Sequence, residues 1–233
     1  MAAGQGGAQG LEPLRTTVVV DYQNVHLVGH GLFVPDQPRH ETLIDPLRYA
    51  QVLLEARNRS IRQGYAPAVL GKVLVFRGHP SPEHDQSGYA RNLAHKEQWE
   101  RDRRVEVTLR PLKYRYARTS DGQTATDSTG RKVLLGVPPQ EKGVDVLCAL
   151  AVVREAQDPA VGLVVLASSD TDLAPALDEA RRLDQAKIET ACWYDSRRRL
   201  GYQLHPTDRG RPLWNTRLTE PDFHASHDQT LYR

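Results

Sequence analysis

The sequence predicts an α/β protein, a three-layer sandwich with a mostly parallel central sheet and one inserted hairpin or flap. Short runs rich in Val, Ile and Leu alternate with longer segments of helical period, a pattern typical of right-handed βαβ units. Two of these runs, at 16–20 and 162–167, are unbroken and do not alternate between apolar and charged residues. Central strands that are covered by helices on both faces have this composition.

The predicted elements follow from these runs in chain order. Six strands are predicted, at 16–20, 72–76, 105–109, 132–136, 162–167 and 187–193. Four helices are predicted, at 46–63, 87–101, 141–156 and 172–183. The turn-rich stretch RTSDGQTATDSTGRK at 118–132 interrupts the alternation, and it predicts the inserted hairpin or flap.

A chain of 233 residues is long enough for one sizeable domain. That domain is predicted at 15–195, after a flexible segment at 1–14. An extension at 196–233 is predicted to pack on the domain or to be partly disordered. The first residues carry no signal-peptide pattern, and no run is apolar over a membrane-spanning length, which predicts a soluble, cytoplasmic protein.

Composition narrows the function classes. The 31 basic and 29 acidic residues leave a formal net charge of +2, which excludes a uniformly basic coat. Any surface for nucleic acid is therefore a local patch. Cys148 and Cys192 form no CxxC pair, so the sequence indicates buried free thiols rather than a disulfide framework or a zinc site.

Polar side chains end two of the predicted strands. The first strand runs into Asp21, with Asn24 three residues later, and the strand at 162–167 runs into Ser168, Ser169 and Asp170, with Asp172 just beyond. The carboxyl ends of parallel strands face the crevice in which ligands bind. Asp21 and Asp170 are therefore expected at the same edge of the sheet.

A third acid lies in mid-chain. The predicted helix at 141–156 is apolar on every side, which is typical of a buried helix, yet Asp145 lies in its first turn. A buried carboxylate costs several kcal/mol unless it is paired, hydrogen-bonded or bound to a metal. Asp145 is therefore expected to have a partner.

Each acid also has a purely structural interpretation. Asp172 suits a helix N-cap, Asp145 suits the positive end of a helix dipole, and Asp21 with Asn24 suits an Asx-turn. Together, however, the acids would crowd at one sheet edge and repel one another. A divalent cation removes this repulsion, and all-oxygen ligands suit Mg²⁺ or Mn²⁺. Such an ion activates water for phosphodiester hydrolysis, leaving a 5′-phosphate and a 3′-hydroxyl, with Asn24 and Ser168 orienting the reactants.

At these residues the sequence resembles the NYN family of PIN-like ribonucleases. The resemblance rests on VVVDYQN, EKGVDV and VLASSDTDLAPALDEAR in this order, and it covers about residues 17–193. It implies a three-layer α/β sandwich with an acidic metal centre, and an endoribonuclease that uses Mg²⁺ or Mn²⁺ on single-stranded or structured RNA.

The resemblance also assigns roles to residues. It implies that Asp21, Asp145, Asp170 and Asp172 form the acidic centre, that Asn24 is the amide after the first strand, and that Lys142 faces the phosphates. Ser169 stands where the family commonly has Gly, and Leu173 stands where it commonly has Phe. Ser169 has less backbone freedom than Gly, and it is expected to narrow the approach of substrate.

A basic segment offers a surface for RNA. Residues 91–118 contain nine Lys or Arg and four acids, and RPLKYRYAR interleaves Lys113 and Arg115 with Tyr114 and Tyr116. Bases stack on aromatic rings while cations follow the phosphate backbone, so this composition suits single strands. The alternative is an edge strand that its charges protect from aggregation.

Three functions remain open on the sequence. The first is the metal-dependent endoribonuclease. The second is a catalytically weak RNA-binding or regulatory module with the same fold, which Ser169 favours. The third is a DNA-directed nuclease, or a phosphatase, that uses the same metal chemistry. A regulatory or antitoxin-like protein partner and a homodimer also remain open.

Overall fold

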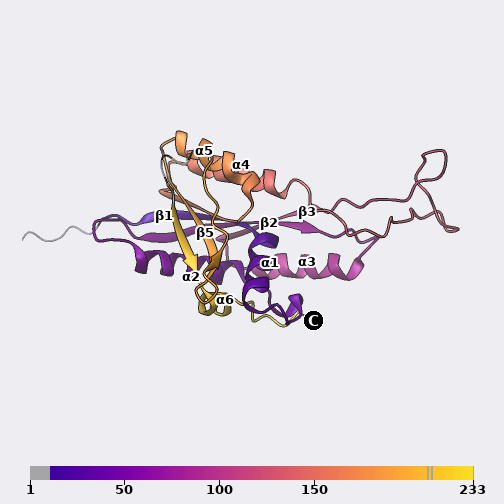
Figure 1. Cartoon of the computed structure of the whole chain (residues 1–233), viewed down its shortest axis with the longest axis horizontal. Helices are drawn as coiled ribbons and strands as arrows, with labels where there is room; N and C mark the ends of the chain where they lie inside the picture. Colours follow the sequence, from indigo (N-terminus) through magenta and orange to yellow (C-terminus); the bar gives the residue numbers. More distant parts are fainter. Residues whose placement is uncertain (1–10, 209, 211, 233) are drawn as a thin grey trace, which may run out of the picture.

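The computed structural model describes residues 11–208, 210 and 212–232 of the chain (Figure 1). The strands are β1 (Leu14–Asp21), β2 (Ala68–His79), β3 (Val105–Pro111), β4 (Leu163–Ala167), β5 (Lys187–Asp195), β6 (Leu200–Gly201) and β7 (Trp214–Leu218). The α-helices are α1 (Tyr22–Phe33), α2 (Pro46–Ser60), α3 (Gln86–Trp99), α4 (Val144–Gln157), α5 (Ala174–Arg182) and α6 (Glu220–Ala225). Two short 3₁₀ helices are η1 (Arg39–Glu41) and η2 (Thr171–Leu173).

The strands form one seven-stranded sheet with β1 near its middle. The order is β3-β2-β1-β4-β5-β6, and β7 pairs with β5 in parallel. All pairings are parallel except that of β5 with the two-residue strand β6. The predicted α/β class with a mostly parallel sheet is therefore confirmed. Between β1 and β4 the order of the strands reverses, which is the usual place for a ligand site in such sheets.

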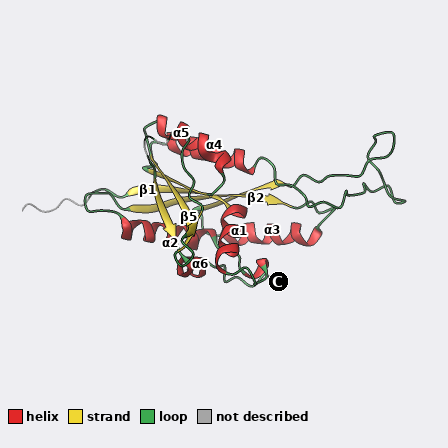
Figure 2. Cartoon of the chain, in the orientation of Figure 1, coloured by secondary structure: helices red, strands yellow, loops and turns green. Residues whose placement is uncertain are grey.

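Helices cover both faces of the sheet, as a three-layer sandwich requires (Figure 2). Successive side chains of β1 point to opposite faces, so Val18 and Val20 join the core beneath α1, α2, α3 and α6, while Val19 joins the core beneath α4 and α5. Both cores are built from buried aliphatic and aromatic side chains. Cys148 and Cys192 are free and buried, as predicted. None of the described helices combines the length and apolar character that a membrane span needs.

The predicted strand at 132–136 is wrong. This segment is one leg of an arm, residues 113–140, that extends away from the sheet beyond β2 and β3 (Figure 1). The two legs are joined by isolated bridges, among them Tyr116 with Leu134 and Thr126 with Lys132. Leu134, Leu135 and Val137 are exposed. Their apolar composition suits a strand, but no described sheet or helix covers them, so the arm is the inserted hairpin and not a core strand.

The main differences from the predicted helices are at α1 and α4, and α6 was not predicted either. α1 was not predicted, and it begins directly after Asp21. The helix predicted at 141–156 begins at Val144, and it is not buried on all sides, because Val146 and Leu150 are 54% and 61% exposed. Asp145 is correspondingly only partly buried, so the expectation that burial forces a partner on it is wrong.

The segments outside the predicted domain are only partly described. Residues 1–10 of the predicted flexible segment lie outside the described residues, and β1 already begins at Leu14. The predicted extension at 196–233 contributes β6, β7 and α6, and β7 pairs with Glu189–Trp193 of β5. The domain boundaries themselves stay a prediction.

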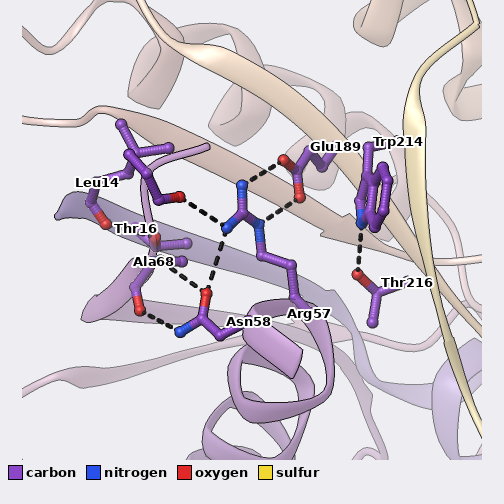
Figure 3. Close-up of polar contacts among 9 residues, drawn as sticks. Leu14, Thr16, Arg57, Asn58, Ala68, Glu189, Trp214 and Thr216 are labelled. Atoms are coloured by element: carbon purple, nitrogen blue, oxygen red, sulfur yellow. Dashed lines mark hydrogen bonds and ion pairs between the residues drawn. The ribbon is translucent and has the colours of Figure 1, made fainter. Parts of the chain in front are cut away.

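A buried ion pair ties α2 to the amino-terminal end of the sheet (Figure 3). The Arg57 guanidinium donates to both carboxylate oxygens of Glu189 on β5, at 2.8 and 2.9 Å, and to the carbonyl oxygen of Ala66 at 3.2 Å. The neighbouring Asn58 side chain bonds the backbone of Ala68 twice. Both partners of the ion pair are nearly inaccessible to water, so each depends on the other for compensation of its charge.

Replacing Arg57 with Ala is expected to lower the free energy of unfolding by about 3–5 kcal/mol, because it leaves the Glu189 carboxylate buried without its cation. Urea denaturation measures this loss. Arg62→Ala, at an exposed position just after the end of α2, is the control and is expected to change stability by under about 0.5 kcal/mol.

The double variant Arg57→Met with Glu189→Leu separates charge from packing. It removes both buried charges, so it is expected to recover most of the loss. A loss below about 1 kcal/mol in Arg57→Ala would contradict the role given to this ion pair.

Candidate functional site

The side chains that follow β1 and β4 meet at the carboxyl edge of the sheet. β1 ends at Asp21 and pairs with β4, whose last residue is followed by Ser168. The Ser168 hydroxyl donates to Asp21 Oδ2 at 2.9 Å, and the Asp170 N–H donates to Ser168 Oγ at 3.1 Å. Residues 147 positions apart are thus held in contact by parallel strand pairing.

Asp21 and Asn24 have structural tasks that bring them into the site. Asp21 is the N-cap of α1, and its Oδ1 accepts from the Asn24 N–H at 3.4 Å, as the Asx-turn interpretation expected. The Asn24 side chain then reaches across to the loop after β4. Its Oδ1 accepts from the N–H and the hydroxyl of Ser169, at 2.9 and 3.0 Å. Asn24 therefore fixes the position of that loop relative to α1.

The loop after β4 presents Asp170 and Asp172 differently. Asp170 is the N-cap of η2, and its Oδ1 accepts from the Asp172 N–H at 3.0 Å. The interpretation of Asp172 as the cap is therefore wrong, because Asp170, two residues earlier, caps η2, and α5 begins only at Ala174. Asp172 is exposed, whereas Asp170 is partly buried.

Gly143 directs the chain into α4. It has a φ of +80°, in the left-handed region that favours glycine, and α4 begins at the next residue. This turn places Asp145 in the first turn of α4 and leaves Lys142 just before it. The Arg110 side chain donates to the Lys142 carbonyl oxygen at 3.4 Å, which links this turn to the end of β3.

These elements enclose an acidic cleft of about 670 Å³. Of the predicted site residues, those that line it are Asp21, Asn24, Lys142, Asp145, Asp170 and Asp172. Ser168 and Ser169 lie behind this surface, bonded to Asp21 and Asn24. The Ser169 hydroxyl donates to Asn24 Oδ1 at 3.0 Å, and the expected narrowing of the substrate approach by Ser169 stays a prediction. Three separate segments of the chain thus supply acids to one space.

Glu141 is a further acid in this cleft that was not predicted. Its Oε2 accepts from the Gly78 N–H at 2.8 Å, and burial raises its pKa. Any side chain at position 78 would collide with this carboxylate, so Gly78 is needed for the close approach. The sequence EKGVD does contain the signal, since Glu141 precedes Asp145 by four residues.

Asp21 has the most strongly perturbed carboxyl of the cleft. Burial raises its pKa from 3.8 to about 6, and the bonds from Ser168 and Asn24 only partly offset this. The charges of Asp170 and Asp145 raise the pKa further, which shows that the three acids sense one another. A cation near Asp21 would favour its ionised form.

The donor set fits a hard divalent cation in its chemistry. The acids that line the cleft offer only carboxylate oxygens, which suit Mg²⁺ or Mn²⁺ better than zinc. Within residues 11–208, 210 and 212–232, no group of three His, Cys, Asp or Glu side chains is arranged to hold an ion. Binding of an ion therefore requires these carboxylates to converge.

The predicted RNA-binding residues of the arm lie outside the cleft lining. The Tyr114 hydroxyl accepts from the Ser81 N–H at 3.0 Å, and the Tyr116 hydroxyl is hydrogen-bonded to His84 Nε2 at 2.9 Å. Both rings pack against His84, with centroids 4.5 and 5.6 Å away. These tyrosines anchor the arm to the loop after β2. Lys113 and Arg115 are exposed beside them.

Comparison with known proteins leaves the family open. No family model matches the chain, and no curated protein matches it. Among solved structures, the crystal structure of a protein of unknown function from Vibrio parahaemolyticus matches with a TM-score of 0.40 and 16% sequence identity. The match covers 78% of this chain and 83% of that chain.

Asp21→Asn is expected to stabilise the metal-free protein at neutral pH. Below pH 3.8 the carboxyl is protonated in both the folded and the unfolded state, so the raised pKa has no effect on stability. Between pH 3.8 and about 6 the folded protein holds the proton more tightly, and stability falls as the pH rises. Above about pH 6 the full cost is present, up to about 3 kcal/mol.

Thermal and urea unfolding in chelator, from acid to neutral pH, measure this effect. The variant is expected to be more stable than the wild type at neutral pH, and the difference is expected to vanish in acid. Asp184→Asn, which makes the same chemical change at an exposed position outside the cleft, is the matched control. A difference that is independent of pH would contradict the assignment.

Proposed function

We propose that this protein is a metal-dependent endoribonuclease with a PIN-like fold of the NYN type. The observation that carries the proposal is the meeting of acids from three segments in one cleft, Asp21 after β1, Glu141 and Asp145 around the start of α4, and Asp170 after β4. This cleft lies where the strand order reverses. The three segments are those on which the resemblance to the NYN family rests.

The acids of the cleft would hold Mg²⁺ or Mn²⁺. Asp21, Asp145 and Asp170 are the proposed ligands, with Glu141 and Asp172 close by. A bound ion of this kind supplies a water of lowered pKa and stabilises charge on the phosphodiester. Asp21 has to lose its proton to bind a cation, so its raised pKa weakens metal binding in acid.

Other residues of the chain position the reactants. Ser168 and Asn24 hold the Asp21 carboxylate and the loop after β4 in place. Lys142 lies at the cleft and is proposed to attract the phosphate of the substrate. Lys113 and Arg115 of the arm are proposed to bind the strand farther away, through charge. RNA is the proposed partner because of the family resemblance.

A second candidate is a catalytically weak RNA-binding or regulatory module with the same fold. The arrangement of the carboxylates favours it, since no three acids of the described residues converge as ion ligands. The two candidates differ in turnover and not in binding. A DNA-directed nuclease with the same site differs from the first candidate only in substrate.

Incubation with end-labelled single-stranded RNA and DNA of the same sequence, with Mn²⁺, with Mg²⁺ or with chelator, tests the proposal. Cleavage of the RNA with either ion is expected, with 5′-phosphate and 3′-hydroxyl ends, and none is expected in chelator. Asp170→Asn and Asp145→Asn are each expected to slow cleavage by at least about 100-fold while the fold survives.

Asp184→Asn is the matched control, because it makes the same chemical change at an exposed turn outside the cleft, and it is expected to cleave at the rate of the wild type. Undiminished cleavage in chelator would refute the metal-dependent mechanism. RNA binding without turnover under every condition would replace it with the second candidate.

A further inference from the structure

A second cavity, of about 780 Å³, lies on the opposite face of the sheet from α4. Its walls come from α1, the end of β2, α3 and the C-terminal residues 228–232. Gln23 and Leu27 of α1 line both this cavity and the acidic cleft. The two spaces are therefore neighbours along α1.

Arg77 lies at the inner wall of this cavity. It follows Phe76, the residue of β2 that pairs with Asp21, and alternation along the strand turns the two side chains to opposite faces. The guanidinium carbon lies 4.8 Å from the centroid of the Tyr22 ring and 5.9 Å from that of the Trp99 ring. Aromatic packing therefore fixes the arginine in place.

The charge of Arg77 has no counter-charge in contact with it. Among the described residues no carboxylate oxygen lies within 4.0 Å of its guanidinium, and its one hydrogen-bond partner is His95 Nδ1 at 3.0 Å. Burial lowers the pKa of His95 to about 4, so this imidazole is neutral at pH 7 and accepts the bond. A guanidinium has five N–H donors, so most of them remain for another partner.

The other charged residues that the structure describes around the cavity do not form an ion pair with Arg77. Asp85 caps α3 by accepting from the Gly88 N–H at 2.7 Å, and Asp228 accepts from Trp99 Nε1 at 2.8 Å and from the Tyr232 hydroxyl at 2.5 Å. The remaining charged or titratable residues of the lining are His26, Arg39, His40, Glu41 and Arg91. The Glu141 carboxylate of the neighbouring cleft acts on the Arg77 charge from beyond ion-pair distance, and Arg91 adds a second positive charge that opposes this effect.

We propose that Arg77 binds a backbone phosphate of the RNA strand that flanks the scissile bond, in a subsite that Gln23 and Leu27 connect to the acidic cleft. The planar guanidinium fork matches two phosphate oxygens, and its stacking on Tyr22 leaves that fork preorganised. Burying a cation partly, without a carboxylate beside it, raises the free energy of the folded protein because the charge loses water. An anion that binds to the guanidinium compensates this loss. The choice of RNA rests on the proposed function, whereas the anion site rests on Arg77 and its surroundings.

The test is RNA binding in chelator, where metal-dependent cleavage is absent. Fluorescence anisotropy with a labelled single-stranded RNA of about 12 nucleotides, over a series of salt concentrations, gives the affinity and its salt dependence. Arg77→Met keeps an apolar stem against Tyr22 and is expected to weaken binding about tenfold, with the salt slope reduced by about 1. Arg77→Lys keeps the charge, and its binding is expected to be intermediate.

Arg62→Met is the matched control, because Arg62 is exposed at the amino-terminal end of the sheet, and it is expected to bind RNA like the wild type. Circular dichroism confirms that each variant is folded, and Arg77→Lys serves if Arg77→Met is not. Wild-type affinity and salt slope in both Arg77 variants would overturn the proposal. So would the absence of RNA binding by the wild-type protein.

Competition with uridine monophosphate and with inorganic phosphate identifies the source of the phosphate. Weak competition that also depends on Arg77, beside tight RNA binding, supports a strand subsite. Arg77-dependent binding of the mononucleotide without RNA binding would overturn it. RNA binding that depends on Arg77, without cleavage in Mn²⁺, would refute the proposed endoribonuclease activity but not the phosphate subsite. Cleavage in Mn²⁺ at the wild-type rate by both Arg77 variants would refute the subsite but not the endoribonuclease activity.

Discussion

The parallel pairing of β1 with both β2 and β4 is the constraint on which the rest of the structure depends. The chain builds β1, β2 and β3 toward one edge, and it returns through the arm and α4 to build β4 and β5 toward the other. The loop after β4 therefore meets the start of α1. Every acid of the cleft owes its position to this reversal, because no two of the three segments are close in the sequence.

The Asp21 carboxylate is destabilised by its position at the end of β1. A carboxylate that ends a central strand is removed from water, and its pKa rises to about 6 even with a hydroxyl and a backbone N–H bonded to it. Among the described residues no Lys or Arg forms an ion pair with this carboxylate, whereas at the other end of the sheet Arg57 neutralises Glu189. The contrast between a fully paired buried acid and an incompletely paired one is typical of the difference between a structural and a functional site.

Much of this arrangement could be predicted from the sequence, because parallel strands have a common direction. Continuous apolar runs that end in Asp21 and Asp170 indicate both the strands and the edge at which their acids meet. α1 was missed because Gly29 and Gly31 weaken its helical pattern, and its N-cap was interpreted as a turn. The apolar run at 132–136 resembles a strand, and only its lack of a covering layer shows that it is not one.

Arg77 was missed for a different reason. In the sequence it is one more basic residue at the end of an apolar run, and its lack of a carboxylate partner is visible only when β2, α1 and α3 are placed together. In the folded chain, Asp21 and Arg77 lie on adjacent strands and turn to opposite faces of the sheet. One is negative and the other positive, and neither charge is fully compensated by its neighbours. Neither can neutralise the other through the sheet. In the function proposed above, a nucleic-acid strand that follows α1 would place one phosphate at the cation held by Asp21 and another at the Arg77 guanidinium, so it would compensate both charges at once. This gives a physical reason for a chain of almost balanced charge to leave both groups without an ion-pair partner among the described residues.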